Sequence, residues 1–200
     1  MKELRLVLLL VLAASLAGCA TSGFGMSFVR VEFRPPGAER QTIEVSEGDT
    51  WEDDTITVAW TPSLNTVYPL LYFSLTNKSD DTLTLPWDDA CIIGPDGAVH
   101  SVFHKGIPYI RMAEPQAPSV IPAGATLHDL LCPAGAPSWK KTTLGYFPLL
   151  LFPVNKTQTL EGYHGKHIRV FLPLDANGVR REYTFIFQVN LVALNTQKGD

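Results

Sequence analysis

The feature that most limits what this chain can fold into is a period-two alternation of apolar and polar residues. Two segments show it most clearly through their apolar residues, which are Ile56, Val58 and Trp60 in the first and Leu71, Phe73 and Leu75 in the second. Successive side chains of a β-strand point to opposite faces, so each segment presents its apolar residues to one side. The alternation predicts two strands with these six side chains in the core.

Glycine and proline separate many such short segments along the chain. The sequence holds 15 of each and 10% aromatic residues, which is typical of a β-rich domain with many turns. Strands are predicted at residues 26–33, 42–45, 55–61, 70–76, 82–85, 91–93, 98–103, 119–121, 126–131, 149–152, 167–174 and 181–191. No long helix is evident, and the acidic residues 47–54 are expected to form a solvated loop.

Turn-forming sequences between the strands predict four hairpins. The turns are residues 77–81, 94–97, 122–124 and 175–178. In the last of them, Asn177-Gly178 favours positive φ, as two-residue hairpin turns require. We therefore expect an all-β domain of about nine to eleven strands in two sheets.

The start of the chain has the organisation of an export signal. Lys2 and Arg5 precede an apolar segment at residues 6–14, which is shorter than the about 20 apolar residues of a membrane-spanning helix. The segment closes on Leu16-Ala17-Gly18-Cys19, which resembles the lipobox of bacterial lipoprotein precursors. The resemblance implies that residues 1–18 are a lipoprotein signal peptide, that Cys19 is lipidated and that residues 19–25 are a tether. The alternatives are an ordinary signal peptide with an incidental cysteine and a retained membrane anchor.

The same resemblance implies a location in the bacterial cell envelope, with acyl chains on Cys19 as the membrane contact. Ala20 follows the cysteine, instead of the Asp that retains lipoproteins at the inner membrane of enteric bacteria. The periplasmic face of the outer membrane is therefore favoured where the cell has one. Removal of residues 1–18 changes the formal net charge from −4 to −5, so the domain is not expected to bind nucleic acid.

A likeness to a known fold comes from the middle of the chain. A strand, Asn77-Lys78-Ser79, a second strand and later Val120-Ile121-Pro122-Ala123-Gly124 resemble the immunoglobulin-like β-sandwich domains of bacterial envelope lipoproteins. The resemblance, over residues 70–131, implies an immunoglobulin-like two-sheet sandwich, which we place at residues 26–195 with a polar tail at 196–200. Such a sandwich needs about 100 residues, so long loops are expected at 104–118, 133–148 and 153–166, where function often lies.

Five histidines raise the question of a metal site, since imidazole is a common ligand of zinc and copper. His100 and His104 lie four residues apart on a predicted strand, which separates them by about 13 Å. His164 and His167 lie closer together, and His128-Asp129 would join them only if two loops meet. We expect ordinary surface or hydrogen-bonded histidines, and no metal or other cofactor.

Two further patterns are candidate catalytic or calcium sites. Asp88 and Asp89 could act as paired carboxylates or bind calcium with Asp96, but we interpret them as turn residues. Ser138-Trp139-Lys140-Lys141 has the Ser-x-x-Lys spacing of penicillin-recognising enzymes without their companion motifs. Since no other catalytic motif is present, we expect that the chain is not an enzyme.

Aromatic residues are candidate binding anchors, because they dominate hot spots, although core packing is the favoured interpretation. The four candidates are Trp87, Trp139, Tyr146 and Phe147. Asn77-Lys78-Ser79 and Asn155-Lys156-Thr157 match glycosylation sequons, to which we assign no meaning in a bacterial lipoprotein.

Cys91 and Cys132 are the cysteines that remain once Cys19 carries lipid. An exported environment can oxidise them, and a bond would close a loop of about 41 residues and contribute roughly 4 kcal/mol. We expect this disulfide. Two buried free thiols are the alternative, because a bond requires Cα atoms within about 7 Å.

Together these features favour a non-enzymatic, membrane-anchored envelope lipoprotein that binds a protein or supports an assembly through its long loops. The sequence identifies neither the binding residues nor the partner. The alternatives are a periplasmic small-ligand or metal-binding lipoprotein and, less favoured, a hydrolase.

Overall fold

The computed structural model describes residues 21–45, 48–65, 68–134, 139–142, 145–148 and 160–194, and these residues form fourteen strands and three short 3₁₀ helices. The strands are β1 (Thr21–Arg34), β2 (Gln41–Glu44), β3 (Thr50–Glu52), β4 (Ile56–Asn65), β5 (Tyr68–Asn77), β6 (Leu83–Leu85), β7 (Cys91–Ile93), β8 (Val99–His104), β9 (Ser119–Ile121), β10 (Thr126–Ala134), β11 (Trp139–Thr142), β12 (Gly145–Pro148), β13 (His167–Ala176) and β14 (Val179–Leu194). The 3₁₀ helices are η1 (Trp87–Asp89), η2 (Tyr109–Arg111) and η3 (Leu160–Tyr163). The predicted all-β class is confirmed.

Residues 24–191 form one compact unit, and the second unit comprises residues 1–23 and 192–200. Of the second unit only the start of β1 and the end of β14 are described. Residues 1–20 lie outside the described residues, so the signal peptide and the lipidation of Cys19 stay predictions. Among the residues that the structure does describe, no helix has the length and apolar character to cross a membrane.

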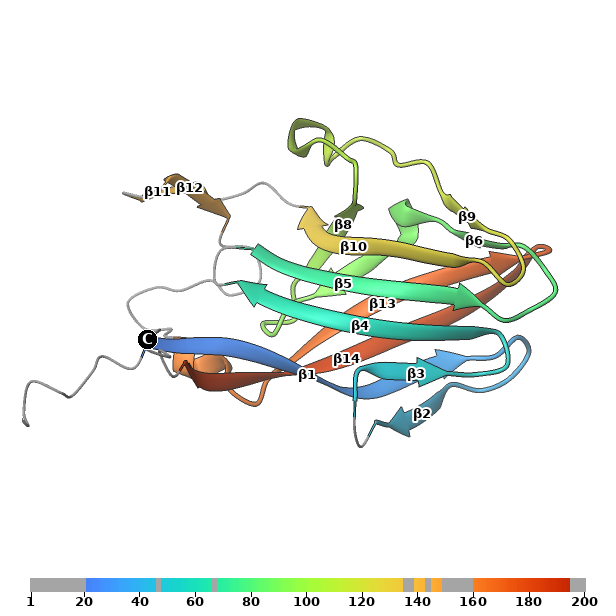
Figure 1. The fold of residues 1–200 in the computed structure, drawn as a ribbon, viewed down its shortest axis with the longest axis horizontal. Coiled ribbons are helices and arrows are strands. Elements are labelled where there is room, and N and C mark those ends of the chain that lie inside the picture. Colours follow the sequence, from blue (N-terminus) through green and yellow to red (C-terminus); the bar gives the residue numbers. More distant parts are fainter. Residues whose placement is uncertain are drawn as a thin grey trace, which may run out of the picture. The chain divides into compact units, whose positions relative to one another are not determined.

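Twelve strands form one antiparallel sheet, which curls on itself (Figure 1). Its order is β2-β1-β14-β13-β7-β8-β10-β5-β4-β3, while β6 pairs with both β13 and β9, and β11 and β12 form a separate pair. The curl brings distant strands of this order together. The rings of Trp60 in β4 and Phe185 in β14 have centroids 5.0 Å apart, and those of Phe33 in β1 and Trp51 in β3 are 5.5 Å apart.

The core fills the inside of this curl. All six residues of the two alternating segments that were predicted to face the core do so, with exposed fractions of 0 to 4%. Aromatic rings make up much of its centre, where Trp60 packs against Phe73, Phe185 and Phe187. The alternation therefore gave the correct inner face of β4 and β5.

Two of the four predicted hairpins are confirmed. Strands β7 and β8 pair across residues 94–97, and β13 and β14 pair across residues 175–178. Asn177 and Gly178 have φ values of 50° and 77°, the left-handed conformation that the Asn-Gly sequence favours.

The other two hairpin predictions are wrong, because the strands beside those turns pair elsewhere. At the turn of residues 77–81, the preceding strand β5 pairs with β4 and β10, whereas the following strand β6 pairs with β13 and β9. At the turn of residues 122–124, the preceding strand β9 pairs with β6, whereas the following strand β10 pairs with β5 and β8. Both turns are crossovers between parts of the sheet.

Several boundaries also differ from the sequence-based prediction. Strand β1 begins at Thr21, within the expected tether. Strand β3 lies in the acidic segment that was expected to be a loop, because Trp51 is 7% exposed and packs into the core. The predicted loop at 133–148 contains β11 and β12. The predicted strand at 149–152 lies outside the described residues.

Candidate functional site

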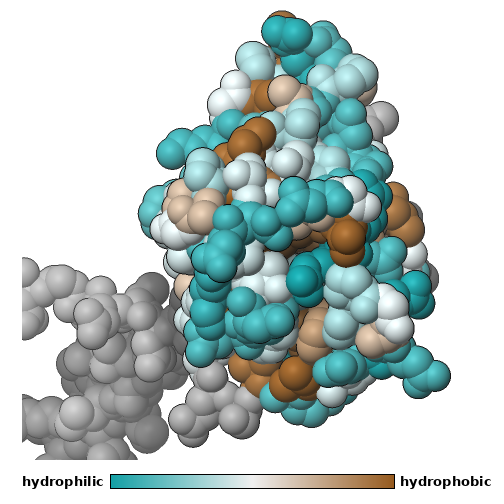
Figure 2. All heavy atoms as spheres, turned by 90° about the vertical axis from the view of Figure 1, so that its right-hand side faces the viewer, coloured by the Kyte–Doolittle hydropathy of each residue, from teal (hydrophilic) through white to brown (hydrophobic). Residues whose placement is uncertain are grey.

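Exposed apolar side chains are scattered over the surface. Viewed from the side of the β13–β14 turn, the surface is mainly hydrophilic and apolar residues form separate small spots (Figure 2). Among the residues whose exposure the structure describes, the large exposed apolar ones are Ile43, Tyr72, Val99, Ile110, Val120 and Val179. Of these, Tyr72 lines a groove, which makes its surroundings the best candidate site.

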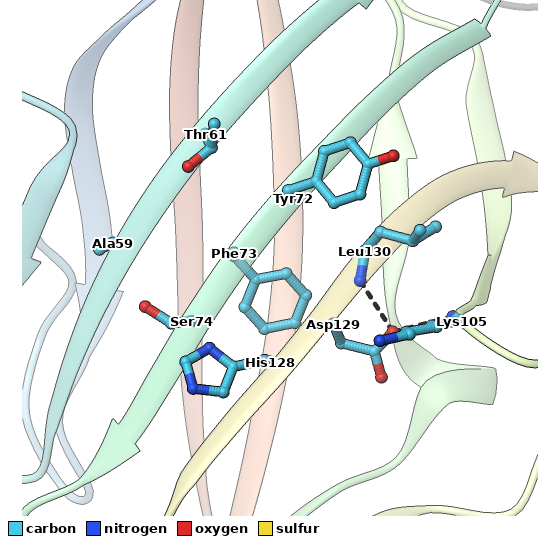
Figure 3. Close-up of a pocket in the computed structure, with 9 residues that line it drawn as sticks. All are labelled: Ala59, Thr61, Tyr72, Phe73, Ser74, Lys105, His128, Asp129 and Leu130. Carbon is cyan, nitrogen blue, oxygen red and sulfur yellow. Dashed lines mark hydrogen bonds between the residues drawn. The ribbon is translucent and has the colours of Figure 1, made fainter.

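This Tyr72 groove lies on the outer face of β4, β5 and β10 and has a volume of about 520 Å³ (Figure 3). It is lined by Ala59, Thr61, Tyr72, Phe73, Ser74, Lys105, His128, Asp129 and Leu130. The register of the strands explains the set, because Thr61, Tyr72 and Leu130 stand in one cross-strand row. Successive side chains of a strand point to opposite faces. Because the neighbouring Trp60, Phe73 and Leu131 face the core, this row faces outward.

A second cross-strand row adds polar chemistry to the groove. Ala59 pairs with Ser74, and Ser74 pairs with His128. Directly opposite side chains on one sheet face have Cβ atoms about 4.5–5.5 Å apart, so the Ser74 hydroxyl and the His128 imidazole are neighbours. His128 is exposed and Ser74 is half-buried.

The carboxylate of Asp129 does not serve His128. Figure 3 shows it turned toward Lys105 and Leu130, whose backbone N–H groups donate to Oδ1 over 2.8 and 2.7 Å. On the inner side, Nδ1 of His104 lies 3.1 Å from Oδ2 of Asp129, and the His104 ring stacks on Trp87 at 4.3 Å. Asp129 thus fixes the start of the 105–118 loop. Its carboxylate does not orient His128, so Asp129 does not complete a catalytic triad with Ser74 and His128.

The loop at residues 105–118 covers a second cavity of about 550 Å³. Gln116 holds the loop in place, because its backbone N–H donates to Asp88 Oδ1 over 3.0 Å and its Nε2 donates to the Val102 carbonyl over 2.6 Å. Of the three loops proposed to carry function, this is the one that the structure describes throughout.

The histidines and aspartates singled out from the sequence are not assembled into one site. His128 faces solvent on β10 while His104 faces inward on β8, and His164 and His167 are exposed near the start of β13. Within the described ranges, no group of three or more His, Cys, Asp or Glu side chains is placed to hold a metal ion.

Each candidate aspartate has a local structural contact. Asp88 accepts the Gln116 N–H, Asp89 lies 2.8 Å from Arg180, and Asp96 accepts the Ala98 N–H over 3.0 Å within the β7–β8 turn. These contacts agree with the interpretation of the three residues as turn and loop residues.

The predicted Cys91–Cys132 disulfide is not formed in this structure, and both residues are free thiols. Strand β8 lies between the two, since Cys91 pairs with Ser101 and Cys132 with Phe103. Two strand spacings separate their backbones by about 10 Å, beyond the about 7 Å that a disulfide allows. Burial raises the pKa of Cys132 to about 12 and raises the pKa of Cys91 as well, which keeps both thiols protonated near neutral pH.

Trp87 is a core residue and not an exposed anchor, since it is 0% exposed and its indole N–H donates to Ser119 Oγ over 2.9 Å. Asn77 of the first sequon is also fully buried. The side chains of Trp139, Tyr146 and Phe147, and the residues Ser138 and Asn155-Lys156-Thr157, lie outside what the structure describes.

Sequence reasoning missed Tyr72. Its signal was available, because an aromatic residue between Leu71 and Phe73 occupies an outward position of the alternation. Comparison with known proteins adds no assignment: no family model, curated protein or solved structure matches the chain.

Proposed function

We propose that this chain is a non-enzymatic envelope lipoprotein that binds an extended segment of a protein partner in the Tyr72 groove. The observation that carries the proposal is the exposure of Tyr72, which is 41% exposed in the middle of a sheet face. Tyrosine supplies a large contact area at low conformational-entropy cost and is enriched in binding hot spots. Thr61 and Leu130 flank it in the same cross-strand row and would frame a bound segment.

The charges of the groove favour an acidic segment as its occupant. Lys105 contributes a cation and His128 contributes an imidazole. The one carboxylate in the lining, Asp129, is 9% exposed and engaged with His104 and two backbone N–H groups. The accessible charge of the groove is therefore positive, although the whole chain is acidic.

The volume of the Tyr72 groove supports a second candidate function, the binding of a small molecule. About 520 Å³ lies within the range of pockets that hold small molecules, which supports a small-ligand-binding lipoprotein as the alternative. An extended peptide fits better with a groove that follows three strands on a single sheet face.

The finer fold and the location belong to the same proposal. The packing of Trp60 in β4 against Phe185 and Phe187 in β14 supports two facing layers, as in an immunoglobulin-like sandwich. A layer backed in this way would hold the Tyr72 groove rigid. The Leu16-Ala17-Gly18-Cys19 sequence supports lipidation of Cys19 and a place on the periplasmic face of the outer membrane.

Photo-crosslinking in intact cells tests this function. A photoreactive phenylalanine analogue replaces Tyr72 in one protein and Val99 in a control, because Val99 is 69% exposed and lies on β8 outside the groove lining. We expect a discrete protein adduct from position 72 and none from position 99. Equal adduct patterns from both positions, or none from position 72, would exclude the groove as the binding surface.

A further inference from the structure

Another groove, separate from the two cavities described above, lies on the outer face of β1, β14 and β13. It has a volume of about 570 Å³ and carries four basic side chains, which are Arg30, Lys166, His167 and Arg169. The inner faces of β4 and β14 pack together in the core through Trp60 and Phe185, so this groove and the Tyr72 groove lie on opposite outer faces. A concentration of basic residues is unexpected in a chain with a net charge of −4.

The strands place two arginines on either side of an apolar floor. Arg169 in β13 pairs in register with Ile186 in β14, which is 3% exposed. Because β14 lies between β1 and β13, the backbones of Arg30 and Arg169 are about two strand spacings, roughly 10 Å, apart. Two long side chains at that separation can reach one small group above Ile186. We call this site the Arg30–Arg169 groove.

The carboxylates of the groove are engaged, while its cations keep donors available. Glu32 lies 3.5 Å from Arg40, and Asp96 accepts the Ala98 N–H. Arg30 uses its Nε–H toward Glu44 over 2.7 Å, which leaves its terminal N–H groups. The side chain of Arg169 makes no hydrogen bond or ion pair with any residue that the structure describes.

Lys166 extends the positive charge at one end of the groove, where His167 adds an imidazole. The Lys166 ammonium lies 5.2 Å from the centroid of the Tyr163 ring, a contact that holds the side chain without neutralising it. The backbone of Lys166 is fixed as well, because its carbonyl accepts the Val189 N–H over 2.8 Å.

We propose that the Arg30–Arg169 groove binds a phosphate ester, held between the two guanidinium groups with Lys166 and His167 at its edge. Guanidinium groups donate to phosphate oxygens in pairs. A tetrahedral phosphate presents oxygens in several directions, so it can accept from both sides of the groove at once, which a planar carboxylate does less well. The phosphate could be a lipid headgroup or part of a soluble or polymeric phosphate, and the chemistry of recognition is the same.

Calorimetric titration of the full chain in neutral detergent with inorganic pyrophosphate tests the site. The test variants are Arg169→Gln and Arg30→Gln, and Arg111→Gln is the matched control, because Arg111 is an exposed arginine on η2 outside this groove. Either test variant should weaken binding by about tenfold or more, whereas the control should stay within about twofold. Circular dichroism checks that all three variants are folded.

The outcomes separate the site from general charge attraction. Absence of saturable binding by the unmodified chain, or equal weakening by the control and the test variants, would overturn the proposal. A second arm adds phosphatidylglycerol or phosphatidylcholine to the micelles. Competition with pyrophosphate by the anionic lipid alone identifies a headgroup as the ligand, while retained pyrophosphate binding without competition identifies a soluble or polymeric phosphate.

Discussion

At the scale of single residues, Asn77 contributes more to the stability of the fold than its place in a polar turn indicates. Its side chain is fully buried, and its Nδ2 donates to the carbonyls of Asp81 and Ile121 over 2.7 and 2.9 Å. Its Oδ1 accepts from the backbone N–H and the hydroxyl of Ser79. One amide thereby ties the end of β5 to β9, 44 residues further along the chain.

Replacement of Asn77 should therefore be costly. Asn77→Ala leaves two carbonyls and an N–H without their partner, and we expect it to lower the free energy of unfolding by about 2–4 kcal/mol. Urea denaturation measures the change. Asn190→Ala is the control, because Asn190 makes one exposed hydrogen bond to Ser27, and it should cost less than about 1 kcal/mol. Similar losses in the two variants would contradict this account.

A second prediction at this scale concerns pH and Cys132. Burial raises the pKa of this thiol from an ordinary value of 9.0 to about 12, so the folded state holds the proton more tightly than the unfolded state. The resulting stability is complete below about pH 9 and is lost as the pH rises toward about 12. Urea midpoints at about pH 8 and about pH 11 should therefore differ less in Cys132→Ala than in the unmodified protein.

The control for this prediction is Cys91→Ala, because Cys91 is half-buried and should have the smaller effect. In Cys132→Ala the loss of stability at high pH should be reduced and not abolished. Burial and the neighbouring Asp53 also raise the pKa of Tyr183, which contributes to the same loss. An unchanged difference between the two pH values in Cys132→Ala would refute the role of this thiol.

At the scale of elements, local signals predicted strands well and their partners less well. At the turns of residues 94–97 and 175–178, the strands on either side of each turn pair with each other, as predicted. The turns at 77–81 and 122–124 have similar residues, yet they join strands with other partners, because contacts such as that of Asn77 with Ile121 decide the pairing. Such contacts join residues far apart in sequence, and no local pattern reports them.

The candidate site follows the same division. Its polar residue His128 was visible as a histidine, but the role considered for it was a metal ligand with other histidines. The groove exists because β5 and β10 pair, which sets Tyr72, Ser74 and His128 side by side. That pairing joins strands about 50 residues apart, as the Thr76–Thr126 hydrogen bond with its separation of 50 residues illustrates.

The β13–β14 turn gives a prediction for a whole element. Gly178 has a φ of 77° and no atom near the position of an added Cβ, so Gly178→Ala should cost only conformational strain, about 1–2 kcal/mol. Gly162→Ala is the matched control, because this glycine also has open space and no positive φ. Thermal unfolding should show a lower melting temperature for Gly178→Ala alone, and equal values for the two variants would contradict the argument.

At the scale of the whole molecule, the curled sheet presents two outer faces with different chemistry. One carries the Tyr72 groove, and the other carries the Arg30–Arg169 groove. In the aromatic core between them, Trp60 packs against Phe73 of β5 and Phe185 of β14. The fold therefore allows two ligands to be bound without competition for one surface.

The proposed anchor should be independent of this folded unit. Cys19→Ser removes the acylation site, so we expect the protein to leave the membrane fraction while its melting temperature changes by less than about 1 °C. Cell fractionation and calorimetry measure the two effects. Cys91→Ser is the control and should stay in the membrane fraction. Retention of Cys19→Ser at the membrane would show that the anchor lies elsewhere.

The buried Asn77 amide also has a consequence for production of this protein. In a eukaryotic secretory host, Asn77-Lys78-Ser79 would meet the glycosylation machinery while the chain is still extended. A sugar on Nδ2 would replace one of the two hydrogens that bond Asp81 and Ile121, and it has no room inside a fully buried site. Chains modified at this position would not reach the native fold, so a bacterial host suits the protein, whereas eukaryotic secretion would select for unmodified chains.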